Sequence, residues 1–346
     1  MRSVLPSMPE PQPTEASAPH PTPETPTFPR VLLAGGGAIA LEAHLPQLRG
    51  LPGNQRVVLY ELSASRRAAI RTRYRDDVAL ELPEQLPEGP FDLAVLATPP
   101  GCHLQEVLRW RPSCPRFVLE KPMARTLEEA CAIASNLEGA LMAVHMPRAE
   151  LAAFDVLKDL YTQGRYGALQ AVQIHDGRVF DWPSVSAALF SKEMSGGGVM
   201  MDLAPHILER LLHLFTGLEV EQCLVDGDRG AVEANAVLQL RGDDRIPVTV
   251  TMSRNRHLSG TAVLTFAEAE ARVGLMAPTV HLAPRQGPGM TLCPDEDAGS
   301  VPFRTLVARF YQRRVVEGRS RPGRALEVMR LLDEAYRVAR PLQGGF

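Results

Sequence analysis

Residues 30–40 read Arg-Val-Leu-Leu-Ala-Gly-Gly-Gly-Ala-Ile-Ala, an apolar run that ends in three glycines. From Gly35 the spacing is G-x-G-x-x-A, after a predicted strand and before a helical pattern from Leu41 to Leu48. Glycines allow a tight turn that approaches a pyrophosphate closely, and the N–H groups at the helix start then bind it. Alone the pattern is weak, because such turns also occur without a ligand. The stretch predicts a dinucleotide-binding turn made by Gly35, Gly37, Ala38, Ile39 and Ala40.

The next hundred or so residues alternate between apolar runs and helical patterns. Strands are predicted at 57–60, 93–97 and 116–119, with helices near 65–73, 103–109 and 125–137. This alternation predicts a doubly wound parallel sheet, with a binding crevice at the carboxyl ends of its strands. Residues that can contact a cofactor stand at those ends and strengthen the prediction: Glu61, Arg66, Thr98, Pro99, His103, Glu120 and Lys121.

Glu61 lies 24 residues beyond Gly37, where a carboxylate can meet the ribose 2′-hydroxyl of the cofactor. Its charge repels a 2′-phosphate and favours NAD, whereas Arg66 and Arg67 close by could bind that phosphate. We therefore expect NAD, with NADP as the alternative.

Lys121 is one of only three lysines in a chain with 34 arginines. Arginine stays protonated, whereas the pKa of lysine falls on burial, so a lysine at a strand end can take part in proton transfer. Further on, Asp202 and His206 follow the run Gly196–Gly198 and share one helix face at i, i+4. Lys121, Asp202 and His206 are therefore the predicted catalytic set.

Each of these residues has a simpler interpretation. Lys121 could be a surface charge, and Asp202 and His206 a helix-start carboxylate and a core histidine. An i, i+4 pair can also bind zinc, but no nearby Cys/His set completes a tetrahedron, so no metal is predicted. Pro205 is tolerated in a helix only near its start. The helix expected at 199–215 could therefore begin close to Ala204, which would change how Asp202 is aimed.

The second half is predicted to form a mostly antiparallel sheet with helices. No helical pattern separates the later strand-like runs from one another, which favours antiparallel pairing. The strand-like runs are 169–174, 234–240, 246–252, 262–266 and 271–275. Helices are expected at 151–161 and 325–338. Candidates for contact with a substrate are His145, Arg148, Asp176, Asp181 and Trp182.

Composition limits the class of protein. A net charge of −3 gives no general attraction to nucleic acid or anionic membranes, and no apolar run reaches the roughly 18 residues of a membrane span. The five scattered cysteines predict reduced thiols and a cytoplasmic location. Nine prolines in residues 1–29 predict a disordered tail. The expected division is this tail, a dinucleotide-binding domain at 30–146 and a substrate-binding and oligomerisation domain at 147–346.

The ordered set of motifs resembles the Gfo/Idh/MocA oxidoreductase family over about residues 30–340. The matching pieces are the glycine turn, His44-Leu-Pro46, Thr98-Pro99-x-x-x-His103, Glu120-Lys121-Pro122, Gly196–Gly198 and Asp202-x-x-x-His206. The resemblance implies an N-terminal Rossmann domain and a C-terminal α/β domain with a large, mostly antiparallel sheet. It also implies a lysine that reaches the nicotinamide ribose and the substrate. Glu209, where the family usually has aspartate, and Ala204-Pro205 depart from the pattern.

We therefore predict an NAD(P)-dependent oxidoreductase that transfers a hydride between nicotinamide and a hydroxyl or keto carbon of a sugar or cyclitol. Two alternatives remain open. A redox-neutral enzyme that epimerises or eliminates with bound NAD would carry the same residues, and a non-catalytic dinucleotide or sugar sensor would share the fold.

Assembly is a separate prediction. The runs 234–240 and 246–252 carry apolar residues on both alternating faces, more than a solvated sheet face tolerates. We expect a homodimer or homotetramer formed through the C-terminal sheet, as the resemblance also implies.

Overall fold

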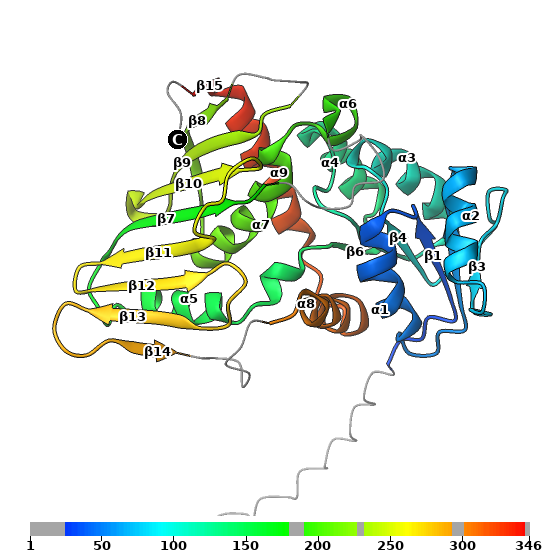
Figure 1. Cartoon of the computed structure of the whole chain (residues 1–346), viewed down its shortest axis with the longest axis horizontal. Helices are drawn as coiled ribbons and strands as arrows, with labels where there is room; N and C mark the ends of the chain where they lie inside the picture. Colours follow the sequence, from blue (N-terminus) through cyan, green and yellow to red (C-terminus); the bar gives the residue numbers. More distant parts are fainter. Residues whose placement is uncertain (1–24, 180–189, 227–231, 293–300, 343–346) are drawn as a thin grey trace, which may run out of the picture.

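The computed structural model describes residues 25–179, 190–226, 232–292 and 301–342. Two β-sheets lie next to each other, each with helices packed against it (Figure 1). The predicted tail at 1–29 falls largely outside the described residues. Its last part does not fit the prediction, because Phe28 is fully buried and its N–H donates to the carbonyl of Pro52 at 2.8 Å.

The first sheet is wholly parallel and confirms the predicted doubly wound arrangement. Its strand order is β3-β2-β1-β4-β5-β6. Because the order changes direction between β1 and β4, the crevice lies at the carboxyl ends of these two strands. Both are buried on both faces, which explains their unbroken apolar sequences. The strands are β1 (Arg30–Ala34), β2 (Arg56–Tyr60), β3 (Leu80–Glu81), β4 (Leu93–Leu96), β5 (Arg116–Leu119) and β6 (Leu141–Val144).

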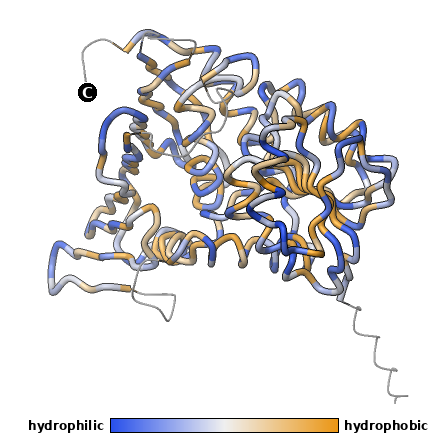
Figure 2. The backbone as a smooth tube through the Cα atoms, turned by 45° about the vertical axis from the view of Figure 1, so that its right-hand side comes forward, coloured by the Kyte–Doolittle hydropathy of each residue, from blue (hydrophilic) through white to orange (hydrophobic). Residues whose placement is uncertain are grey.

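The helices between these strands confirm the three that the sequence predicts. Ser63 caps one and Thr126 another, each accepting a hydrogen bond from the N–H three residues on. Hydrophobic segments gather around the strands in the interior of this region (Figure 2). The helical elements are η1 (Ala40–His44, a π-type turn), α1 (Leu45–Arg49), α2 (Ala64–Arg73), α3 (Pro100–Trp110), η2 (Arg111–Ser113), α4 (Leu127–Asn136) and η3 (Pro147–Glu150).

The second sheet has nine strands in the order β14-β13-β12-β11-β7-β10-β9-β8-β15. It is mixed but mostly antiparallel, as predicted, with parallel pairs only between β7 and β10 and between β8 and β15. The strands are β7 (Leu169–Gly177), β8 (Glu219–Val225), β9 (Asn235–Arg241), β10 (Pro247–Ser253), β11 (Thr261–Phe266), β12 (Ala269–Gly274), β13 (Val280–Pro284), β14 (Met290–Leu292) and β15 (Ala339–Pro341).

One face of this sheet is covered by α5 (Ala153–Gln163), α7 (Val199–Leu214) and α9 (Pro322–Arg337) (Figure 1). The opposite face is less apolar than the sequence analysis expected. Across its centre, register places Gln239, Thr249, Gln173 and Val263 in one row, with Val237 and Thr251 in the next. These side chains are half-buried or exposed, whereas their neighbours along each strand are buried.

A late segment of the chain returns to the first sheet. It consists of α8 (Phe303–Phe310) and η6 (Tyr311–Val316). Val307, Phe310, Tyr311 and Val315 join the same buried cluster as Val31 and Leu33 of β1. The short helix α6 (Lys192–Ser195) packs against α3. None of the described helices is both long and apolar enough to cross a membrane.

Candidate active site

Lys121 and Asp202 come together where the two sheets adjoin. Lys121 is the second residue after strand β5, and its Nζ lies 2.6 Å from Oδ1 of Asp202 and 2.8 Å from the Asp202 carbonyl oxygen. Asp202 is in the first turn of α7. Both side chains are 19% exposed, so the ion pair is partly shielded from water yet open to a small molecule.

Arg254, which the sequence analysis missed, completes this group. Its Nε and Nη2 lie 3.2 and 3.1 Å from Oδ2 of Asp202. Burial alone would raise the pKa of the Asp202 carboxyl, but the charges of Lys121 and Arg254 outweigh burial and hold the pKa well below its usual range. Asp202 is thus a fixed anion between two cations. Only the position of Arg254 immediately after a predicted strand could have drawn attention to it.

His206 lies one helical turn beyond Asp202 on α7 and is buried. Burial, followed by the nearby charges of Arg148 and Lys121, lowers its pKa well below 6.5. Its Nδ1 is buried and has no hydrogen-bond partner among the described residues. A neutral imidazole beside a lysine can accept a proton, so the three predicted catalytic residues form one chemically coherent set.

Helix α7 begins at Val199, so the alternative of a start near Ala204 was wrong. Pro205 lies inside the helix, where its missing N–H leaves one helical hydrogen bond unmade. The start is fixed by Glu233, whose Oε1 accepts from the N–H groups of Gly198 and Met200 at 2.9 and 3.1 Å. A Cβ at Gly198 would clash with the Glu233 backbone. The glycine run therefore serves packing at the helix start.

The glycine turn fits a dinucleotide. Gly35 has a φ of 91°, and a Cβ there would meet the Ala97 carbonyl oxygen at 2.9 Å. Above Gly37, by contrast, no atom lies within 4 Å of the place where a Cβ would be. That open space, just before Ala38, Ile39 and the helical turn that starts at Ala40, suits a pyrophosphate.

Two further strand ends face the same crevice. Thr98 follows β4, and its Oγ1 is buried without a partner among the described residues, while Pro99 caps α3. At the end of β2, Glu61 accepts hydrogen bonds from the N–H groups of Gly36 and Ser63 and from Arg66 at 3.2 Å. The Glu61 carboxylate therefore braces the glycine turn and lies at the place predicted to distinguish NAD from NADP.

His103, which the sequence analysis places among the cofactor residues, lies inside the protein. Its ring is fully buried, with Nδ1 3.0 Å from the Met123 carbonyl oxygen and Nε2 2.9 Å from that of Thr98. Burial lowers its pKa, so the neutral ring donates to one of these carbonyls at a time. His103 thus tethers the loop after β4 to the loop that follows Lys121.

The predicted substrate contacts divide into three groups. His145 is 1% exposed and belongs to an internal cluster with Glu120 and His44, so it is not open to a substrate. Arg148 lies near His206 and pairs with Asp176 at 3.1 Å, and both side chains are partly exposed. Asp181 and Trp182 lie outside the described residues.

Arg210, another residue that the sequence analysis did not select, is buried one turn after His206. Its guanidinium donates to the carbonyls of Arg148 and Leu275 at 2.9 and 2.8 Å and stacks 4.5 Å from the Phe154 ring centre. Burial lowers its pKa to about 9. Arg210 adds to the positive potential that keeps His206 neutral.

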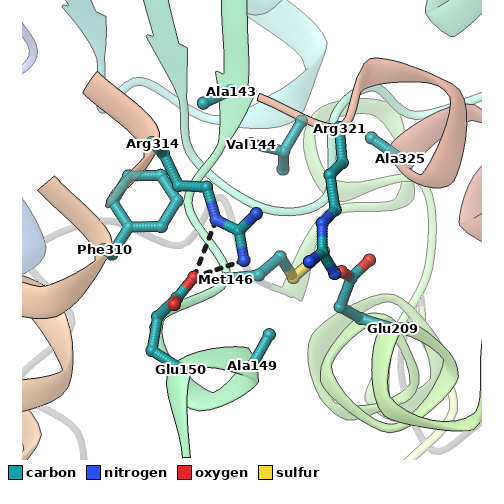
Figure 3. Close-up of a pocket in the computed structure, with 10 residues that line it drawn as sticks. All are labelled: Ala143, Val144, Met146, Ala149, Glu150, Glu209, Phe310, Arg314, Arg321 and Ala325. Carbon is teal, nitrogen blue, oxygen red and sulfur yellow. Dashed lines mark hydrogen bonds and ion pairs between the residues drawn. The ribbon is translucent and has the colours of Figure 1, made fainter. Parts of the chain in front are cut away.

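A cavity elsewhere lies between β6, η3, α7, η6 and the start of α9 (Figure 3). In it Arg314 donates to Glu150, with Nε 2.8 Å from Oε1. Glu209 also lines it, and burial raises the pKa of Glu209. None of the predicted catalytic or cofactor residues lines this cavity, which separates it from the Lys121 site.

The parallel sheet has a glycine turn at its switch point, and helix α7, which covers the large mixed sheet, supplies a carboxylate and an imidazole. This arrangement defines a dinucleotide-binding α/β protein of the oxidoreductase class. The chain belongs to the Gfo/Idh/MocA family: residues 29–145 match its NAD-binding Rossmann fold and residues 154–269 match a GFO/IDH/MocA C-terminal domain.

Curated relatives are similar over part of the chain. Scyllo-inositol 2-dehydrogenase (NADP(+)) IolW of Bacillus subtilis (strain 168) is 28% identical over 189 residues, which are 54% of this chain and 51% of IolW. The uncharacterized oxidoreductase YdgJ of Escherichia coli (strain K12) is 29% identical over 195 residues, which are 55% of this chain and 54% of YdgJ. The chain thus spans about half the length of the curated relatives it matches.

Solved structures share the fold over most of the chain. The 3-ketoreductase KijD10 from Actinomadura kijaniata, in complex with NADP and TDP-benzene, gives a TM-score of 0.76 at 16% identity, covering 90% of this chain and 98% of that one. Levoglucosan dehydrogenase, in complex with NADH and levoglucosan, gives 0.74 at 16% identity, covering 89% and 96%.

Proposed function

We propose that the chain is an NAD(P)-dependent dehydrogenase or reductase acting on a CH–OH or keto carbon of a sugar or cyclitol. The observation that carries the proposal is the Lys121–Asp202 ion pair beside a neutral His206, next to a glycine turn that fits a dinucleotide. Two relatives, named for scyllo-inositol and levoglucosan, support this substrate class.

The bound nicotinamide would supply the hydride chemistry. The open backbone at Gly37 and the Thr98 hydroxyl are suited to hold the dinucleotide, with Glu61 near its ribose. We expect NAD in preference to NADP, because the Glu61 carboxylate disfavours a 2′-phosphate.

The residues of the chain move the proton and stabilise charge. During oxidation His206 accepts the hydroxyl proton as the carbon loses its hydride, and during reduction it returns that proton. The Lys121 ammonium stabilises the negative charge that develops on the substrate oxygen. Asp202, held by Lys121 and Arg254, keeps the lysine aimed at that oxygen. A positioned acid–base group contributes about 10²–10⁴-fold to the rate.

The test is to replace Lys121 and His206 singly by alanine and to measure cofactor affinity and turnover separately over a panel of polyols. Lys158→Ala and His213→Ala are matched controls, since Lys158 lies on α5 and His213 on the same helix as His206. Turnover lost in both variants, with cofactor still bound and the controls active, supports the assignment. Turnover retained in both variants would end it.

Location and assembly are part of the proposal. The absence of a predicted disulfide pattern leads us to expect a cytoplasmic enzyme, and we expect a homo-oligomer that pairs the outward faces of the nine-stranded sheet.

A further inference from the structure

Four buried side chains form a hydrogen-bonded network immediately behind Lys121. Oε1 of Glu120 lies 2.8 Å from Nε2 of His44 and 2.6 Å from Nδ1 of His145. On its other side, Nδ1 of His44 lies 2.7 Å from the Tyr311 hydroxyl. The histidine rings also pack together, with centres 4.3 Å apart. The four residues are between 0 and 8% exposed, so their polar atoms depend on one another for hydrogen bonds.

The protons in this network have one consistent arrangement. Burial lowers the pKa of His44 to about 4 and raises the pKa of Tyr311 well above 10, so the imidazole is neutral and the phenol keeps its proton. The phenol then donates to Nδ1 of His44, and Nε2–H of His44 donates to Glu120. Burial opposes ionisation of Glu120, but the two histidines outweigh it and hold its pKa well below its usual range. Glu120 is therefore the ionised carboxylate of the network, and His44 and Tyr311 are neutral.

The second oxygen of the same carboxylate points back to the catalytic segment. Oε2 of Glu120 accepts from the Lys121 N–H at 3.1 Å. Meanwhile the Glu120 N–H donates to the Leu96 carbonyl at 2.9 Å, which fixes this strand end to β4. The backbone from which the Lys121 side chain projects is thus held by the carboxylate of the residue before it.

The other members of the network come from separate parts of the fold, with Tyr311 joined to Glu120 through His44. His44 ends the helical turn that follows the glycine turn, His145 follows β6, and Tyr311 begins η6. One carboxylate therefore ties the lysine segment to the helix expected to bind the pyrophosphate and to the late segment 303–316.

We infer that His44, His145 and Tyr311 are positioning residues, which hold Glu120 so that Lys121 keeps a fixed place relative to the dinucleotide-binding turn. The catalytic consequence rests on the proposed function, because it takes Lys121 to act on the substrate. The effect on the position of Lys121 does not rest on the proposed function, because that position can be measured without turnover.

The scarcity of lysine allows a direct measurement. With three lysines in the chain, protein labelled with [ε-¹³C]lysine gives three side-chain NMR signals, and Lys121→Arg identifies that of Lys121. The test variant is Glu120→Gln. Its matched control is Glu106→Gln, which alters another buried carboxylate, one that accepts from Trp110 at 2.6 Å and contacts neither Lys121 nor the network. Tyr311→Phe is a gentler variant that removes only the phenolic oxygen.

We expect Glu120→Gln to shift or broaden the Lys121 signal alone and to lower kcat about 10²-fold. Tyr311→Phe should shift the same signal less, and Glu106→Gln should leave all three signals and kcat unaltered. An unmoved Lys121 signal in folded Glu120→Gln and Tyr311→Phe would overturn the inference. So would a moved signal with unchanged kcat in an enzyme that depends on Lys121.

The same cluster offers an alternative that the experiment separates. The two imidazoles and the carboxylate place ligand atoms within 4.8 Å of one another, a set that can bind zinc or iron. One equivalent of tightly bound metal in purified protein, with unfolding on chelation, would replace the hydrogen-bonded network and overturn the inference. Metal-free protein with the Lys121 response described above supports it.

Discussion

The Nζ of Lys121 and Oδ1 of Asp202 lie 2.6 Å apart although the two residues are 81 positions apart in the chain. One follows a strand of the parallel sheet and the other opens a helix that covers the mixed sheet. The contact therefore makes the position of Lys121 depend on how the two halves of the molecule pack together.

Asp202→Asn should weaken both function and stability. The amide keeps the shape but removes the charge that pairs with Lys121 and Arg254, and hydrogen bonds to charged groups contribute about 1.5–3 kcal/mol. We expect the free energy of unfolding in urea to fall by about 1.5–3 kcal/mol and kcat to fall with it. Asp155→Asn, which alters a solvent-exposed pair with His213, should cost much less. Equal losses in the two variants would contradict a special role for Asp202.

The pH dependence of oxidation should show an unusually acidic lower limb. The pKa of His206 lies well below 6.5, so its imidazole stays unprotonated and able to accept a proton as the pH falls through 6.5. We expect kcat/KM to stay level from neutral pH to below 6.5 before it declines. A decline centred at 6.5 or above would show that the base is another group or that His206 is more hydrated.

Stability should fall on mild acidification because of His44. Its pKa is about 4 in the folded protein, against 6.5 when exposed, so the unfolded chain takes up the proton first. The contribution is complete above pH 6.5 and is lost as the pH falls towards 4. It corresponds to about 3 kcal/mol in the free energy of unfolding. His44→Gln can still donate to Glu120 but does not titrate, and urea unfolding should show a flatter pH dependence for it.

Cofactor preference should respond to Glu61. The wild-type protein is expected to bind NADH more tightly than NADPH by fluorescence titration, because the carboxylate repels a 2′-phosphate. Glu61→Gln should narrow the difference between the NADH and NADPH affinities, because the side chain that pairs with Arg66 then no longer repels a 2′-phosphate. Tighter binding of NADPH by the wild type would show that Arg66 and Arg67 dominate instead.

Light scattering tests the predicted assembly. We expect a mass at least twice the 37.8 kDa of one chain, and dissociation on Thr249→Arg, which places a charge in the outward row with Gln239 and Val263. Glu270→Arg, nearer the sheet edge, serves as the comparison. Any truncation should stop at residue 24, because Phe28 is part of the core. A single-chain mass at micromolar concentration for the wild type would refute the prediction.

The sequence was sufficient for β1, β2, β4 and β5 of the parallel sheet, because these strands are apolar runs and each is followed by a distinctive turn. It did not single out the edge strands β3 and β6. It also selected Lys121, Asp202 and His206, whose spacing and rarity are visible without a structure. It did not disclose Arg254 or Arg210, since arginine is common in this chain and nothing local marks a buried one. It also did not show that His103 and His145 are buried, because a histidine that bonds backbone carbonyls or a buried carboxylate looks the same in sequence as one that faces a ligand.

Segment 303–316 completes the core around β1, although it is synthesised long after the parallel sheet. Its apolar side chains fill a cluster with β1, which is made some 270 residues earlier, while Tyr311 completes the network around Glu120. A nascent chain that has produced the whole parallel sheet therefore still presents an unfilled apolar surface until residues near 310 emerge. Fragments that end after β6 should be retained by chaperones, and the lysine segment reaches its final surroundings only after segment 303–316 has been made.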